Sequence, residues 1–81
     1  MIDENTIEIY SKDNCQFCVK AKILLEQNNL SYTEIDAVEK REDLIKRVIQ
    51  ITGRPPRTVP QIFIGDQYIG GYDDLVAHFA K

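Results

Sequence analysis

The chain contains two cysteines, Cys15 and Cys18, and only two residues separate them. A disulfide between residues this close in sequence closes a very short loop, so it removes little conformational entropy from the unfolded chain. A structural zinc site needs four ligands, and only His78 could join the two thiols as a strong nitrogen or sulfur donor. A stabilising crosslink and a zinc site are therefore the weaker interpretations, and the spacing favours a reactive dithiol.

The elements that must position this dithiol follow from the hydrophobic pattern. A run of β-branched and aromatic residues before Cys15 predicts a strand, and Cys18, Ala21 and Leu25 share one face of the helix that follows. Gly53 and the two prolines beyond it predict the end of a second helix. The predicted strands span residues 6–11, 31–36, 61–64 and 67–69, and the predicted helices span residues 15–28, 40–51 and 72–80.

The order βαβαββα predicts an α/β fold with a four-stranded mixed sheet and three flanking helices. The first two strands should be parallel through a right-handed crossover, and the last two should form a hairpin. We expect the strand order 2-1-3-4, helices on both faces, and a single domain over residues 1–81. The last helix is expected to bury Leu75, Val76 and Phe79. The dithiol then lies at the carboxyl end of a central strand, where open α/β sheets tend to place their sites.

The predicted position of Cys15 at the start of a helix has chemical consequences. Unpaired N–H groups and the positive end of the helix dipole both favour a thiolate over a thiol. Lys12 lies just upstream and adds a positive charge near the sulfur. Cys18 lies one turn deeper, and helix geometry places the two Cα atoms roughly 5 Å apart, within the range of a disulfide. The pair can therefore open and close without rebuilding the helix.

The overall charge of the chain excludes some classes of partner. Lys and Arg total 10 residues against 13 Asp and Glu, which gives a formal net charge of −3. Such a chain, without a basic tract, is poorly suited to general binding of nucleic acid or anionic membranes. No apolar run approaches the roughly 18 residues of a membrane helix, and residues 1–5 lack the features of a signal peptide. We therefore expect a cytoplasmic protein with no nucleic-acid or membrane partner. We also expect this small domain to be a monomer.

Three motifs carry a resemblance to a known family. They are Cys-Gln-Phe-Cys after the first strand, Thr-Val-Pro before the third, and Gly-Gly-Tyr-Asp-Asp at the last helix, at residues 15–18, 58–60 and 70–74. Over essentially its whole length the sequence resembles a dithiol glutaredoxin. The resemblance implies a thioredoxin-like fold and an oxidoreductase with glutathione as co-substrate. Its substrates would be protein disulfides and glutathionylated proteins, among them ribonucleotide reductase for some members.

The resemblance also implies roles for individual residues. Cys15 would be the nucleophile, Cys18 the resolving thiol, and Pro60 a cis-proline that faces them and belongs to the glutathione site. The backbone of Val59 would pair with the cysteinyl part of glutathione, as in the addition of a short β-strand. The other implied glutathione contacts are Thr58 in the same groove, Tyr72 and Asp73 at the start of the last helix, and Lys12 and Phe17 near the thiol.

Gln16 and Phe17 stand where the most familiar dithiol motif of the family has Pro and Tyr. Gln16 restores a backbone N–H that proline lacks, and this donor could stabilise the thiolate further. Some members without that proline bind a [2Fe–2S] cluster between two subunits, so a cluster carrier with Cys15 as ligand is an alternative, although catalysis is favoured. A further alternative is a thioredoxin-like donor that a flavoprotein reductase serves.

Residues 40–57 contain six Lys or Arg side chains against the two acids Glu42 and Asp43. Most such tracts are solvated surface, but this one could also steer anionic glutathione or an acidic partner. In the family, a side chain of the middle helix often contacts the glycine carboxylate of glutathione. The sequence leaves Lys46, Arg47 and Gln50 open for that position.

Overall fold

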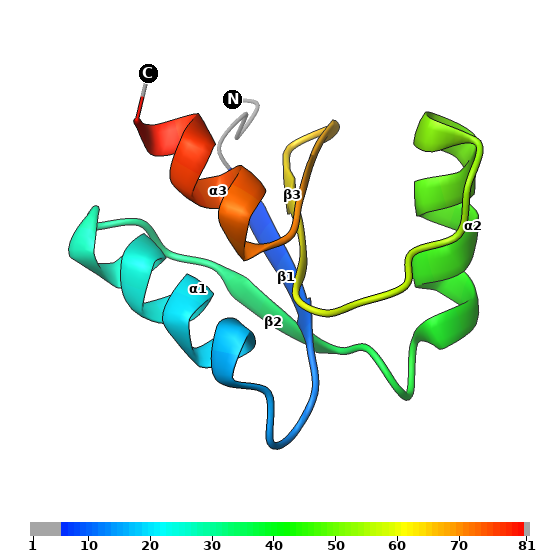
Figure 1. Ribbon diagram of the computed structural model, residues 1–81, viewed down its shortest axis with the longest axis horizontal. Helices are drawn as coiled ribbons and strands as arrows, with labels where there is room; N and C mark the ends of the chain where they lie inside the picture. The colour runs from blue at the N-terminus through cyan, green and yellow to red at the C-terminus, as the bar shows by residue number, and fades with distance from the viewer. Residues whose placement is uncertain (1–5, 81) are drawn as a thin grey trace.

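The computed structural model describes residues 6–80. Helices α1 and α3 cover one face of a central sheet, and α2 covers the other (Figure 1). None of the helices among these residues is long and apolar enough to cross a membrane. The elements are β1 Ile7–Ser11, α1 Gln16–Gln27, β2 Thr33–Asp36, α2 Arg41–Thr52, β3 Gln61–Ile64, β4 Gln67–Gly70 and α3 Tyr72–Phe79.

The strand order is β2-β1-β3-β4, which confirms the predicted sheet. β1 runs parallel to β2 and antiparallel to β3, and β4 returns antiparallel to β3. The last residue of β1, Ser11, pairs with Asp36 of β2, and Tyr10 pairs with Gln61 of β3. The chain therefore leaves the carboxyl end of an inner strand and passes directly into α1.

The alternation of side chains along the strands divides the core between the two faces. Ile7 and Ile9 of β1 pack with α1 and α3 in one cluster, which includes the fully buried Leu25 and Leu75. Tyr10 of β1 points to the opposite face, where it packs with residues of α2. The members of this second cluster are Tyr10, Ala37, Leu44, Val48 and Phe63.

Apart from shifts of one residue at the ends of other elements, two details differ from the sequence-based expectation. Val76 is 41% exposed, because α3 contacts the core through one stripe centred on Leu75, and Val76 lies about a quarter-turn away from it. The second strand begins at Thr33, two residues later than predicted. Asn29 has a positive φ of 59° after the end of α1, and the chain uses residues 30–32 to return to the sheet.

Candidate active site

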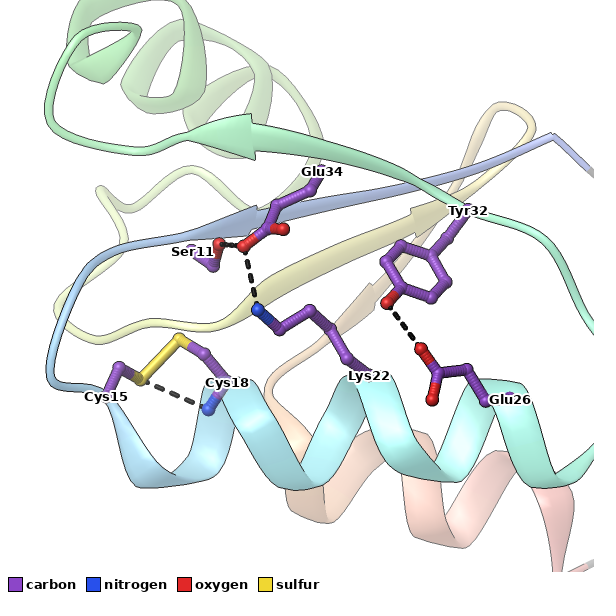
Figure 2. Close-up of polar contacts among 7 residues, drawn as sticks. All are labelled: Ser11, Cys15, Cys18, Lys22, Glu26, Tyr32 and Glu34. Atoms are coloured by element: carbon purple, nitrogen blue, oxygen red, sulfur yellow. Dashed lines mark hydrogen bonds and ion pairs between the residues drawn. A yellow bond between two sulfur atoms is a disulfide. The ribbon is translucent and has the colours of Figure 1, made fainter.

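Cys15 is the N-cap residue of α1, and Cys18 lies in the first turn of that helix. The backbone of Cys15 is extended, with φ −112° and ψ 105°, as is typical of an N-cap. Its sulfur accepts a hydrogen bond from the backbone N–H of Cys18, with the nitrogen 3.1 Å from Sγ (Figure 2). The cysteine sulfur therefore occupies the place that a serine or aspartate oxygen usually takes at the start of a helix.

The two cysteines form a disulfide, and their Cα atoms are 5.2 Å apart. This separation agrees with the roughly 5 Å predicted from helix geometry. Cys18 is 1% exposed, whereas Cys15 is half-buried. An incoming thiol or disulfide can therefore reach the sulfur of Cys15 more readily than that of Cys18.

The peptide bond between Val59 and Pro60 is cis, as the resemblance implied. The carbonyl oxygen of Val59 lies 3.8 Å from the Sγ atom of Cys15. A disulfide sulfur carries no proton, so this is a packing contact in the oxidised protein and not a hydrogen bond. The fold thus places the backbone of Val59, which lies 44 residues later in the sequence, directly against the sulfur of Cys15.

Gln61, the first residue of β3, holds this segment in place. Gln61 is 4% exposed, and its Nε2 donates a hydrogen bond of 2.8 Å to the carbonyl oxygen of Thr58. Its Oε1 accepts a hydrogen bond from the Tyr68 hydroxyl. Burial, reinforced by Asp74, raises the pKa of Tyr68, so this hydroxyl is a donor at neutral pH. Sequence analysis missed Gln61, although a polar residue at the start of an apolar strand was an available signal.

A groove of about 460 Å³ separates the cis-proline segment from the start of α3. The rings of Phe17 and Tyr72, on α1 and α3, pack against each other with centroids 5.9 Å apart. The groove brings together six of the seven residues that the resemblance assigned to glutathione. They are Phe17, Thr58, Val59, Pro60, Tyr72 and Asp73.

A glycine with positive φ allows α3 to begin beside this groove. Gly70 has a φ of 114°, which disfavours any other residue, and a Cβ there would clash with the carboxylate of Asp74. That carboxylate accepts a hydrogen bond of 3.0 Å from the N–H of Gly71. A Cβ on Gly71 would lie 3.6 Å from the carbonyl oxygen of Pro60. The first turn of α3 therefore lies close to the cis-proline segment.

Lys12, the seventh residue, lines a second groove on the α2 side of the same segment. The two grooves share Thr58 and Val59. Two further cations line the second groove, Arg41 at the start of α2 and Arg57 before Thr58. Both arginines belong to the basic tract of residues 40–57 that could steer glutathione, but neither was predicted to line a groove, although the adjacency of Arg57 to Thr58 was an available signal.

The α2 side chains that line this second groove are Arg41, Leu44 and Ile45, and none of Lys46, Arg47 and Gln50 is among them. Arg47 instead donates hydrogen bonds of 2.9 Å to Glu8 and to the Tyr10 hydroxyl. Its guanidinium also lies 3.9 Å from the ring centroid of Phe63. Arg47 therefore joins α2 to the sheet and is not free to reach the groove.

A hydrogen-bonded ion pair lies on the β2 side of the dithiol (Figure 2). The Glu34 carboxylate accepts hydrogen bonds from Ser11 Oγ at 2.5 Å and from Lys22 Nζ at 2.9 Å. These two hydrogen bonds, that of Ser11 first, lower the pKa of Glu34. A hollow beside the pair is lined by both cysteines, Lys22 and Glu34. Although cysteine and glutamate side chains meet in this hollow, residues 6–80 contain no group of three or more His, Cys, Asp or Glu side chains suited to a metal ion.

Comparisons with known proteins agree with this geometry. The Glutaredoxin family model matches residues 7–69 of the chain. Glutaredoxin 3 of Escherichia coli K12 is 47% identical over 78 residues, which cover 93% of this chain and 87% of that protein. Glutaredoxin 1 of Rickettsia prowazekii is 41% identical over 71 residues, which cover 88% of this chain and 74% of that protein.

Solved structures show the same fold. Glutaredoxin 1 from Francisella tularensis, complexed with cacodylate, superposes with a TM-score of 0.75 at 37% identity, covering 93% of this chain and 92% of that chain. A buckwheat glutaredoxin–glutathione complex gives a TM-score of 0.76 at 30% identity, covering 96% and 71% of the two chains. With its Cys15–Cys18 pair and thioredoxin-like sheet, the chain belongs to the glutaredoxin family and is a thiol–disulfide oxidoreductase.

Proposed function

We propose that the protein is a glutathione-dependent oxidoreductase that reduces protein disulfides and glutathione mixed disulfides. The observation that carries this proposal is the position of the Val59 backbone, next to cis-Pro60 and against the sulfur of Cys15. The cysteinyl residue of glutathione can lie extended along Val59 and pair with its backbone, as an added β-strand does. In that position its sulfur reaches Cys15.

The charges of glutathione match the two grooves that meet at Val59. The γ-glutamyl end carries a carboxylate, which suits the N–H groups at the start of α3, and an ammonium, which suits Asp73. The glycyl end carries a second carboxylate, which Lys12, Arg41 and Arg57 attract. The side chains proposed to flank the peptide between its two ends are Phe17, Thr58 and Tyr72.

In the proposed reaction, the Cys15 thiolate attacks one sulfur of the substrate disulfide and the other sulfur leaves as a thiolate. With a protein disulfide, the Cys18 thiolate then attacks Cys15 Sγ, which closes the Cys15–Cys18 disulfide and releases the second substrate thiolate.

With a glutathione mixed disulfide, the protein thiolate leaves first. A second glutathione thiolate then attacks the glutathionyl sulfur, releases oxidised glutathione and restores Cys15. Two molecules of glutathione likewise reopen the Cys15–Cys18 disulfide.

The proposed partners are proteins that present an accessible disulfide or a glutathionylated cysteine, ribonucleotide reductase among them. The half-buried position of Cys15 supports this choice, because it favours a disulfide that protrudes from its own surface. The protein is proposed to act on these partners as a cytoplasmic monomer.

The decisive test of glutathione dependence mixes the oxidised protein with reduced glutathione and follows the opening of the Cys15–Cys18 disulfide. Oxidised glutathione is recycled by glutathione reductase and NADPH, so NADPH consumption reports turnover. We expect rapid reduction by glutathione and little by thioredoxin reductase with NADPH. Reduction by thioredoxin reductase alone would identify a thioredoxin-like donor and contradict the proposal.

Serine substitutions test the roles of the two cysteines. Cys15→Ser should abolish the reduction of both substrate classes, because it removes the attacking sulfur. Cys18→Ser should keep the reduction of glutathione mixed disulfides and lose most reduction of protein disulfides, which needs the resolving thiol. The reverse pattern would show that the roles are exchanged.

A further inference from the structure

The proposed reaction requires Cys18 to ionise, although this residue is buried in the first turn of α1. The thiolate of Cys18 must form before it can attack the mixed disulfide on Cys15, yet Cys18 is 1% exposed, and burial disfavours a thiolate. The backbone N–H of Cys18 is directed at the sulfur of Cys15 and is therefore not available to Cys18 itself. A positive charge beside the buried sulfur would favour its ionisation.

The nearest candidate on α1 is Lys22, which lies four residues after Cys18 and therefore on the same face of the helix. Lys22 and Cys18 line one hollow together with Cys15 and Glu34. This hollow shares no lining residue with the groove between the cis-proline segment and α3. Lys22 lines neither this groove nor the second groove proposed for glutathione, so it can act on Cys18 without contacting that ligand.

Glu34 holds the Lys22 side chain in this position, and Ser11 in turn holds Glu34. Its Nζ atom lies 2.9 Å from Oε2 of Glu34, and the same oxygen accepts the 2.5 Å hydrogen bond from Ser11, which is 3% exposed. Figure 2 shows Lys22 reaching from α1 to Glu34 on β2, with the disulfide at the start of the same helix. Lys22 thus lies on the same face of α1 as Cys18. Its ion-pair partner, Glu34, extends toward it from the sheet.

We propose that Lys22 is a positioning residue for the resolving step, in which its ammonium, held by Glu34, stabilises the thiolate of Cys18. The inference rests on the proposed role of Cys18 as the resolving thiol. In this step the proton of Cys18 passes to water. The Cys18 thiolate then forms a bond to Cys15 Sγ, the bond between Cys15 and the substrate sulfur breaks, and the substrate leaves as a thiolate.

Other charged and titratable groups also lie around the dithiol. Lys12 and Asp13, on the loop after β1, line the same hollow with opposite charges. On the side of α3, Tyr72 and Asp73 line the separate groove. These groups stay unchanged in every variant described below, so their contributions to the charge on Cys18 cancel in the comparison.

The test measures the ionisation of Cys18 alone. In a Cys15→Ser protein, Cys18 is the only thiol of the chain, and the hydroxyl of the introduced serine can cap α1 in place of the cysteine sulfur. The thiolate is followed by its ultraviolet absorbance as the pH rises. Lys22→Met in this background should raise the pKa of Cys18, with a thiolate fraction at neutral pH about three- to tenfold lower. Lys22→Arg should restore the fraction to within about twofold of the parent value.

Glu34→Gln separates this role from a purely structural one. Both Lys22→Met and Glu34→Gln break the ion pair, but only the first removes the positive charge. We therefore expect Glu34→Gln to leave the pKa of Cys18 unchanged or lower. Lys46→Met, on the exposed surface of α2, is the matched control and should change nothing. An unchanged pKa in Lys22→Met, or an equal rise in Glu34→Gln, would overturn the proposal.

A single-turnover experiment measures the resolving step itself in the protein with both cysteines. The reduced protein is mixed with a chromogenic aromatic disulfide, and the release of the second aromatic thiolate reports the attack by Cys18. Lys22→Met should slow this release about three- to tenfold near neutral pH and restore it at high pH, where Cys18 ionises without help. An unchanged rate would overturn the proposal. Neither measurement uses glutathione, so a failure here is distinct from a failure of glutathione dependence.

Discussion

The backbone N–H of Cys18 donates a hydrogen bond to the sulfur of Cys15, over a distance of 3.1 Å from nitrogen to sulfur. One cysteine therefore provides, through its backbone, the donor that stabilises negative charge on the other. The same arrangement makes Cys15 the cap of α1, so the local fold and the chemistry of the site depend on one contact.

Gln61→Leu should loosen the cis-proline segment. The substitution removes the hydrogen bond to the carbonyl oxygen of Thr58 and leaves that group and the Tyr68 hydroxyl without their partner. We expect a loss of about 1–3 kcal/mol in the free energy of unfolding, measured in urea, and a higher KM for glutathione mixed disulfides. Gln67→Leu, at the exposed first position of β4, is the control. Equal effects of the two variants would contradict the role of Gln61.

Gly70→Ala should cost more stability than Gly53→Ala. Both glycines have positive φ, but a Cβ at Gly70 meets the Asp74 carboxylate, whereas nothing lies within 4 Å of a Cβ at Gly53. We expect a loss of about 1 kcal/mol at Gly53 and at least about 2 kcal/mol at Gly70 from urea unfolding. Equal losses at the two positions would show that the start of α3 adapts to the added methyl group.

Acid should reduce the stability that Glu34 provides. Its hydrogen bonds to Ser11 and Lys22 lower its pKa in the folded protein below the ordinary 4.5. A lowered folded-state pKa gives stability that is present above the unfolded pKa and is lost as the pH falls through the folded value. The wild type should therefore be more stable than Glu34→Gln at pH 7, and this difference should shrink below about pH 4.5. A difference in urea midpoints that does not change with pH would contradict this assignment.

Arg57→Gln should weaken the binding of the glycyl carboxylate. Arg57 lines the second groove with Lys12 and Arg41, next to the Thr58–Val59 backbone. We expect KM for a glutathione mixed disulfide to rise about three- to tenfold with kcat little changed, and the effect to decrease at high salt. Lys46→Gln, which does not alter this groove, should keep the wild-type KM. An effect of the same size in Lys46→Gln would indicate a general loss of positive charge instead of a specific contact.

The sequence predicted the features that depend on local patterns or on the three motifs. These include the order of the elements, the strand order, the helix start at Cys15 and, through the resemblance, the cis bond at Pro60. The contacts of Gln61 with Tyr68 and of Lys22 with Glu34 were not predicted. Each joins different elements, and no local pattern specifies which side chains face each other across them. Val76 was placed on the wrong side of α3 because an eight-residue helix gives too few apolar positions to define its buried stripe.

The most direct test of the account is the titration of Cys15 in a Cys18→Ser protein, where it is the only thiol. The backbone N–H of residue 18 survives this substitution, so the donor to the Cys15 sulfur is retained. The account predicts that the pKa of Cys15 lies well below the ordinary value of a free cysteine, with the thiolate predominant at neutral pH. A pKa at or above the ordinary value would contradict it.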